Sequence, residues 1–367
     1  MIDEIERNNT RLQASQESLA AEKAGNRVGI RPADPVVGIN YLKPNPRLAD
    51  HRLDYSVSQE LEFPTVYGLR RQVASRQDRV LDQVHGLQRR DLVDEALQTW
   101  LDWVYRQENR QVLQLQREHA EQLAEAYQRA FDAGSVSVLE RNRARVFAQN
   151  AQQAVALNEI ELEGSWYELI RLNGGQALAK VPQAYPAWDL PPSFEQWFSQ
   201  VSDREAGMHV LEAELEVLRT EQQLATAMGL PNISLGYMRE QDIEVDFRGF
   251  TLGLSLPLWQ NRGRAQHARL KSRAQQSLLE DAGQQFELQQ RHLYQKARAL
   301  HQQLRALRSL LAESQEPQLL RSALDLGQIS LLDYFMELGI YYDLQEKLVT
   351  AERDYYMTQA AMRVSLY

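Results

Sequence analysis

The sequence predicts a mainly helical fold with a small β part, and three observations support this prediction. Residues that break helices are scarce, with only 18 glycines and 12 prolines among 367 residues, whereas the two together usually make up about 12% of a protein. Long segments rich in Gln, Glu, Arg, Leu and Ala lack proline, and these residues favour helices. Four short segments instead alternate apolar with small or polar residues, the pattern of a strand with one apolar face.

The first half of the chain is predicted to contain two strands and two helices after an N-terminal helix. Period-two alternation predicts strands at 35–42 and 54–63. A long helix is expected over 64–131, because Pro64 suits a first helical turn and no later proline interrupts the segment. A shorter helix is expected over 137–172.

The second half repeats this order of elements. After a helix, strands are predicted at 231–239 and 248–256, followed by a long helix over 257–325 and a shorter helix over 330–366. Between the halves, prolines mark 174–202 as a linker segment.

Apolar residues in the second half also recur in alternating steps of four and three, which is the seam of a coiled coil. A plain amphipathic face packed on a local core is the alternative. The seam positions are Leu300, Leu304, Leu307, Leu311, Leu344, Leu348, Ala351 and Tyr355.

The two halves match each other in sequence at three places. The matching pairs are 35–41 with 231–237, 61–64 with 254–257, and 130–140 with 323–333. Because the three matches share nearly the same spacing, we expect a duplicated unit, with a first repeat over 1–173 and a second repeat over 203–367.

Composition and charge exclude several classes of protein. No run of about 18 apolar residues occurs, so a transmembrane helix is not expected. The 41 basic and 50 acidic residues give a formal charge of −9, which argues against nucleic acid as a partner because phosphate contacts require a basic surface. The chain has no cysteine, which excludes disulfides, thiolate zinc sites and cysteine nucleophiles.

The four strands need a partner for their apolar faces, since a two-stranded hairpin is not stable alone. Helices that continue directly from the strands at Pro64 and Pro257 extend the sheet rather than cover it. We therefore favour a barrel closed by strands of other copies, with lipid on its apolar outside; a soluble sandwich is the alternative. The expected lipid-facing residues are Val37, Ile39, Tyr41, Val57, Leu61, Phe63, Ile233, Leu235, Tyr237, Phe250, Leu252 and Leu254.

These segments resemble the outer-membrane factor family, the TolC-like exit ducts of bacterial efflux pumps and type I secretion. The resemblance rests on the strand segments LPNISLGY at 230–237 and GLSLPL at 253–258, and on the turn motifs DAG at 132–134 and DLG at 325–327. It covers essentially the whole chain.

The resemblance implies a homotrimer with a 12-stranded β-barrel in outer-membrane lipid and an α-helical barrel in the periplasm, with 174–202 near an equatorial belt. It also implies a periplasmic adaptor (membrane fusion) protein and an inner-membrane pump as partners. GYMRE at 236–240 and NRGR at 261–264 look most like the heavy-metal (CzcC-like) branch. Family members are exported, so the acidic start MIDEIE, which is no signal peptide, is expected to belong to a mature or trimmed chain. The lipid-bearing N-terminal cysteine of part of the family is absent.

The two turn motifs are the main candidates for function. Gly134 and Gly327 suit the left-handed conformation that ends a helix, and Ser137 and Ser330 each precede an acidic residue by the spacing of a capping box. The resemblance implies that these tips dock the adaptor, whereas capping alone is the alternative. The expected docking residues are Ala133, Gly134, Ser135, Val136, Gly327, Gln328 and Ile329.

Two acidic residues at the tips are candidates for a periplasmic gate. Glu140 and Asp333 match acidic positions that, in the family, lie near the constricted end of the tunnel. Three copies of each would form a negative ring that attracts cations. A purely capping role is the alternative.

No catalytic or metal-binding pattern occurs in the sequence. The seven histidines are scattered without a metal-ligand spacing, and no glycine-rich phosphate loop is present. We therefore expect no enzyme activity and no cofactor. The predicted function is the passive outer-membrane channel of a tripartite efflux system, with heavy-metal cations as the candidate substrate. A type I secretion duct and a soluble coiled-coil scaffold are the alternatives.

Overall fold

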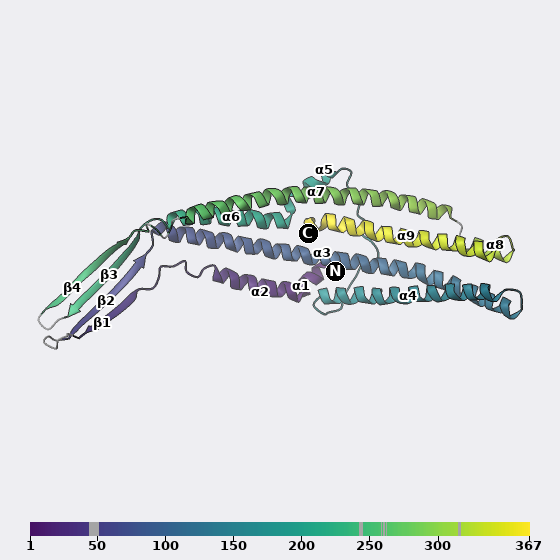
Figure 1. Ribbon diagram of the computed structural model, residues 1–367, viewed down its shortest axis with the longest axis horizontal. Helices are drawn as coiled ribbons and strands as arrows, with labels where there is room; N and C mark the ends of the chain where they lie inside the picture. The colour runs from purple at the N-terminus through teal and green to yellow at the C-terminus, as the bar shows by residue number, and fades with distance from the viewer. Residues whose placement is uncertain (44–50, 242–244, 258, 260, 262, 315–316) are drawn as a thin grey trace. The chain divides into compact units, whose positions relative to one another are not determined.

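The four predicted strands form one antiparallel sheet in the computed structural model (Figure 1). The structure describes residues 1–43, 51–241, 245–257, 259, 261, 263–314 and 317–367. The strands are β1 (Val36–Leu42), β2 (Arg52–Leu61), β3 (Asn232–Gln241) and β4 (Asp246–Ser255), and they are ordered β1-β2-β3-β4. Because β2 pairs with β3, the hairpins of the two halves join into one sheet with β1 and β4 at its edges. Arg262 and Leu258 of the resemblance motifs lie outside the described residues.

The chain divides into two units. The unit that we call the sheet unit comprises Ala14–Leu87 and Glu205–Gln285, and the helical unit comprises Met1–Gln13, Gln88–Arg204 and Phe286–Tyr367. Both therefore draw on both halves of the sequence. Whether the halves are repeats of one unit stays a prediction.

The second predicted strand ends earlier than expected. Residues 54–63 were predicted, but β2 ends at Leu61, so Phe63 lies outside the sheet. The N–H of Glu62 donates to the Tyr67 hydroxyl at 2.9 Å instead of to a neighbouring strand. Helix α3 (Pro64–Asp132) then begins at the proline, which matches the long helix predicted from residue 64.

The second long helix is interrupted, in contrast to the prediction of one helix over 257–325. Helix α7 (Arg264–Glu313) begins after Gly263, whose φ of 88° is incompatible with a helix, and α8 (Pro317–Asp325) follows. Pro317 lacks the N–H that would donate to Glu313, so the ladder of hydrogen bonds cannot pass through it. A proline in the first turn of α8 is well tolerated.

The remaining helices of the helical unit match the expected positions within a few residues, with one addition. Helix α4 spans Val138–Leu172, and α9 spans Leu331–Arg363 and ends in a 3-10 turn, Val364–Leu366. The expected linker 174–202 contains an unpredicted helix, α5 (Phe194–Val201), followed by a 3-10 turn, Ser202–Arg204. Ser193 caps α5 by accepting a hydrogen bond from the Gln196 N–H. Helix α1 (Ile2–Asn8) belongs to the same unit.

The helical unit is built around several clusters of apolar side chains. In the largest cluster, Ile5 of α1, Leu101 of α3 and Leu169 of α4 are each at most 1% exposed. The indole N–H of Trp100 donates to the Pro182 carbonyl at 2.8 Å, which fastens the chain after α4 onto this core. Trp197 of α5 is likewise buried, against α7 and α9.

The predicted apolar seam also packs as a cluster within the helical unit. Leu304 and Leu307 of α7 are buried against Ala351 and Tyr355 of α9, and the other seam positions except Leu311 pack around them. The four–three spacing therefore identified two helices that face each other.

A half-buried carboxyl group lies in the helical unit. Glu108 of α3 is near Glu352 of α9, and its Oε2 atom is buried without a hydrogen-bond partner among the described residues. Burial, together with the negative charge of Glu352, raises the pKa of Glu108 to about 7. Glu352 itself pairs with Arg308 at 2.5 Å.

We expect this carboxyl group to make stability depend on pH. The folded chain binds the Glu108 proton more tightly than the unfolded chain, so its contribution is complete below about pH 4.5 and is lost as pH rises through about 7. Allowing for solvent screening of a half-exposed group, the loss is about 1–2 kcal/mol. Thermal unfolding of the native chain and Glu108→Gln at pH 5 and pH 8 measures it: the variant should be relatively more stable at pH 8. If stability changed equally with pH in both proteins, the pH dependence would not come from Glu108.

Helices α2 (Thr10–Gly25) and α6 (Ala206–Ala227) pack beside α3 in the sheet unit. Lys23 of α2 pairs with Asp82 of α3 at 2.5 Å. Arg76 of α3 donates to the carbonyl of Glu216 in α6 at 2.8 Å. These contacts join the two helices that precede β1 and β3 to the helix that follows β2.

Candidate functional site

The two faces of the sheet differ sharply in chemistry. Residues paired across antiparallel strands point to the same face, so the register sorts every side chain. Val37 pairs with Val57, Val57 with Tyr237, and Tyr237 with Phe250, which together form one apolar row across all four strands. Further rows on what we call the apolar face are Leu61, Ile233 and Leu254; Gln59, Leu235 and Leu252; and Ile39, Tyr55, Arg239 and Arg248.

All predicted lipid-facing residues except Phe63 therefore share one face, and much of this face is exposed. Phe250 is 89% exposed, Leu252 78% and Val37 70%. Monomeric soluble proteins rarely leave a contiguous apolar patch of this kind uncovered. Tyr55, which lies two residues before Val57 on the same strand and was not among the predicted residues, belongs to the same face.

The opposite face, the polar face, carries many small residues beside a few larger ones such as Met238 and Phe247. A Cβ atom on Gly38 would lie 2.6 Å from Ser56 Oγ, and one on Gly253 would lie 2.2 Å from Ser234 Oγ. A Cβ on Gly236 would lie 3.2 Å from the Val57 carbonyl oxygen. A side chain in place of these glycines would therefore crowd its neighbours on the polar face.

The first turn motif ends α3 with a left-handed glycine and two specific backbone hydrogen bonds. Gly134 has a φ of 72°. The Ser135 N–H donates to the Ala130 carbonyl at 2.8 Å, and the Gly134 N–H donates to the Phe131 carbonyl at 2.9 Å, which is a Schellman motif. Around Gly327 the same pair of bonds ends α8, at 2.9 and 3.0 Å.

Both predicted capping boxes are present. Glu140 Oε2 accepts hydrogen bonds from the Ser137 N–H and hydroxyl, each at 2.8 Å. Asp333 Oδ2 accepts from the Ser330 N–H at 3.2 Å and from its hydroxyl at 2.6 Å. These hydrogen bonds hold the pKa of both carboxyls below the usual range, so both remain charged at neutral pH.

The structure brings the two turn motifs together at one end of the helical unit (Figure 1). Phe147 of α4 and Phe335 of α9 meet edge to face with ring centroids 5.2 Å apart. Leu123 of α3 and Leu338 of α9 are fully buried in the same cluster. We call residues 132–140 and 325–333 the paired tips.

A set of exposed apolar residues that the sequence did not predict surrounds the paired tips. Leu139 and Leu332 occupy matching positions of the two motifs and are 67% and 56% exposed. A helical residue's exposure depends on which face the core covers, so the spacing alone did not reveal it. The exposed set is Val138, Leu139, Val146, Leu326, Leu332 and Met336.

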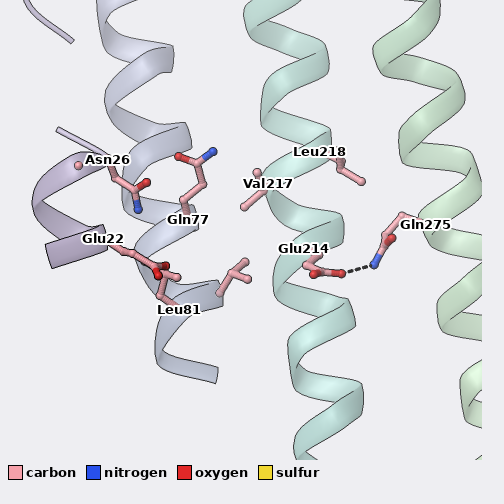
Figure 2. A pocket seen from close by; sticks show the side chains of 10 residues that line it. Glu22, Asn26, Gln77, Leu81, Glu214, Val217, Leu218 and Gln275 are labelled. Atoms are coloured by element: carbon pink, nitrogen blue, oxygen red, sulfur yellow. Dashed lines mark hydrogen bonds between the residues drawn. The ribbon is translucent and has the colours of Figure 1, made fainter. Parts of the chain in front are cut away.

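The sheet unit also contains an open pocket of about 660 Å³ among α2, α3, α6 and α7 (Figure 2). Its walls include Leu81, Val217 and Leu218. Gln275 on its rim donates to Glu214 Oε2 at 2.9 Å, so these polar groups satisfy each other rather than converge on a ligand.

Among the described residues, no group of three or more His, Asp or Glu side chains could hold a metal ion. No helix in the described part of the chain is both long and apolar enough to cross a membrane.

No protein-family model matches the chain, and no curated protein matches it in sequence. Solved structures do match. A membrane protein from Pseudomonas aeruginosa is 16% identical with a TM-score of 0.84, and the match covers 100% of this chain and 92% of that one. CusC, solved in a study of transmembrane channel formation, is 16% identical with a TM-score of 0.82, covering 100% and 90%. The CmeC outer membrane channel of Campylobacter jejuni is 14% identical with a TM-score of 0.80, covering 99% and 84%.

The fold is that of outer-membrane channels. This confirms the predicted fold class, long helices combined with a four-stranded antiparallel sheet. At these identities the likeness concerns the fold. The roles expected for the apolar face, the paired tips and the two acidic residues stay predictions.

Proposed function

We propose that the chain is the outer-membrane channel component of an efflux system and acts as a passive duct without enzyme activity. The observation that carries this proposal is the exposed apolar face of a sheet whose two edges are open, in a chain with the fold of outer-membrane channels. Lipid would cover this face, and strands of other copies would pair with β1 and β4.

A homotrimer is the assembly we propose, with four strands from each chain in a 12-stranded barrel. Barrel closure removes the open edges, and the polar face would line the interior. A soluble coiled-coil scaffold does not account for the exposed apolar sheet.

The paired tips are proposed to dock a periplasmic adaptor, which would link the duct to an inner-membrane pump. In support, Ala133 and Gly134 are exposed and allow close approach of another helix, and Leu139, Leu326 and Leu332 offer apolar surface beside them. Gln328 is exposed and Ile329 half-buried in the second tip, as Ser135 and Val136 are in the first.

Heavy-metal cations are the proposed substrate, on the resemblance of 236–240 and 261–264 to the heavy-metal branch. A type I secretion duct for polypeptides is the alternative with the same architecture. The pump encoded beside this chain would distinguish the two, since they differ in that partner.

The mass of the detergent-solubilised protein and its conductance test the proposal. We expect an assembly of three chains of 42.3 kDa each, and ion conductance when it is added to planar bilayers. A chain that stays monomeric in the aqueous phase and conducts no ions would contradict the proposal.

Glu140 and Asp333 are proposed to form a negative constriction, and a double variant tests this. In Glu140→Gln with Asp333→Asn, an amide oxygen can still accept the hydrogen bonds of Ser137 and Ser330, while the charge is lost. We expect a several-fold drop in the cation-to-anion permeability ratio in planar bilayers, because the field that concentrates cations is removed.

Ser330→Ala is the matched control for this variant, since it removes one cap and leaves both carboxylates. Its permeability ratio should equal that of the native chain. A ratio that is unchanged in the double variant would show that the two carboxylates serve only as helix caps.

A further inference from the structure

Charged residues at the hairpin end of the sheet are sorted by face. This is the end where β1 joins β2 and β3 joins β4, opposite the ends that lead into helices. On the apolar face, Arg239 pairs directly with Arg248, one row beyond Tyr237 and Phe250. Like charges directly opposite each other destabilise a sheet unless an anion compensates them.

Among the described residues, one carboxylate lies between the two arginines. Arg239 donates two hydrogen bonds to Asp246, from Nε to Oδ1 at 2.9 Å and from Nη2 to Oδ2 at 3.0 Å. Arg248 Nη2 donates to the same Oδ2 at 2.6 Å. Counting only residues that the structure describes, one carboxylate thus accepts hydrogen bonds from two guanidinium groups, which leaves a net positive charge.

The guanidinium groups remain accessible despite these bonds. The side chain of Arg239 is 37% exposed and that of Arg248 59%. Lys43 adds a third cation at the same end, with its Nζ 5.8 Å from the ring of Tyr41 on the apolar face.

On the polar face at the same end, negatively charged side chains outnumber positively charged ones among the described residues. Arg52 pairs there with two carboxylates, Asp54 at 2.8 Å and Glu240 at 2.5 Å. Within the described residues, therefore, positive charge is in excess on the apolar face and negative charge on the polar face.

The order of rows along the apolar face matches the layers of a lipid leaflet. Aliphatic Leu254 and Leu252 come first, then aromatic Tyr237 and Phe250, then the arginine pair. Successive rows are about 7 Å apart, so the guanidinium groups follow the aromatic row at the depth where lipid headgroups begin.

We propose that Arg239 and Arg248 bind the phosphate of a lipid headgroup in the leaflet around the hairpin end of the barrel. Arginine presents paired N–H donors that match phosphate oxygens, and the adjacent aromatic and aliphatic rows would hold the acyl chains. The inference rests on the proposed membrane location of the sheet and adds a specific class of lipid.

Native mass spectrometry of the full chain in detergent tests the inference. The probes are diphosphorylated lipid A and the same lipid without phosphates. We expect the native protein to retain the phosphorylated form preferentially. Arg239→Gln with Arg248→Gln should weaken that retention at least about tenfold, since hydrogen bonds between charged groups are lost. Arg248→Gln alone is the milder variant if the double variant fails to fold.

Arg52→Gln is the matched control, because it removes one arginine from the polar face at the same end. Its retention of the phosphorylated lipid should equal that of the native chain. Undiminished retention in the arginine variants, or an equal loss in Arg52→Gln, would overturn the inference. Conductance in bilayers of phosphatidylcholine alone reports on the channel separately, so failure of lipid selection is distinguishable from failure of the proposed function.

Discussion

Replacing Leu252 by arginine is expected to abolish the proposed insertion of the sheet into the outer membrane. Leu252 lies on β4 in a central row of the apolar face, paired with Leu235, and is 78% exposed. An arginine on the lipid face near the bilayer midplane costs about 2–4 kcal/mol per chain. In the proposed trimer the cost applies three times, so we expect at least a tenfold loss from the membrane fraction.

Helical content should not change in Leu252→Arg, because the exposed side chain contributes little to the packing of the helices. Fractionation of membranes combined with circular dichroism of the purified protein measures both quantities. If the variant lost its helices as well, the loss of insertion would reflect misfolding rather than contact with lipid.

Thr251→Arg is the matched control. Thr251 is the neighbouring residue on the same strand, also exposed, and the register places it on the polar face opposite Gly236. An arginine there would point into the proposed barrel interior, where water can solvate it, so insertion should continue. Equal loss in both variants would contradict the assignment of lipid to the apolar face.

The sheet shows how far the sequence could predict this fold. Alternation with period two identified the strands and sorted their faces correctly, because that period is a local property of the chain. Phe63 was placed wrongly, since alternation continues through it although the following Pro64 begins α3. The pairing of Val57 with Tyr237, which joins strands far apart in sequence, required the structure.

The helical unit shows where local patterns stop being informative. Gly134, Ser137 and their counterparts in the second half marked the tips, because turn geometry and capping depend on nearby residues. The contact of Phe147 with Phe335 joins distant segments and has no signature in either one. The burial of Trp197 was missed although apolar residues recur at the i, i+3, i+4 and i+7 spacing of a helix within Phe194–Val201, because the prolines before this segment marked it as a linker.

Gly174→Ala is expected to cause the largest loss of stability in the helical unit. Gly174 follows α4 with a φ of 67°, and a Cβ atom there would lie 2.2 Å from the Asn8 carbonyl oxygen. Because the obstructing atom belongs to the backbone of the last residue of α1, it cannot rotate away. Strain in the left-handed region and the steric clash together should cost about 2–4 kcal/mol.

The clash would also break a buried set of amide contacts. Asn8 Nδ2 donates to Asn173 Oδ1 at 3.0 Å, and Asn9 Nδ2 donates to the Leu172 carbonyl at 2.8 Å. Asn173 is fully buried and Asn9 is 6% exposed, so pushing α1 away leaves these polar groups unpaired at further cost. We therefore expect α1 to detach first, with trypsin cleaving after Arg7 well before the rest of the chain unfolds.

Gly175→Ala separates the effect of left-handed backbone strain from the effect of the steric clash with Asn8. Gly175 also has a positive φ, 81°, but a Cβ atom there meets nothing within 4 Å. This variant should lose only the conformational part, about 1–2 kcal/mol, and should keep Arg7 protected from trypsin. Denaturant unfolding measures the difference between the variants, which isolates the effect of the close approach to Asn8. If the two variants were equally destabilised, left-handed strain alone would explain both, and α1 would not depend on the absence of a side chain at Gly174.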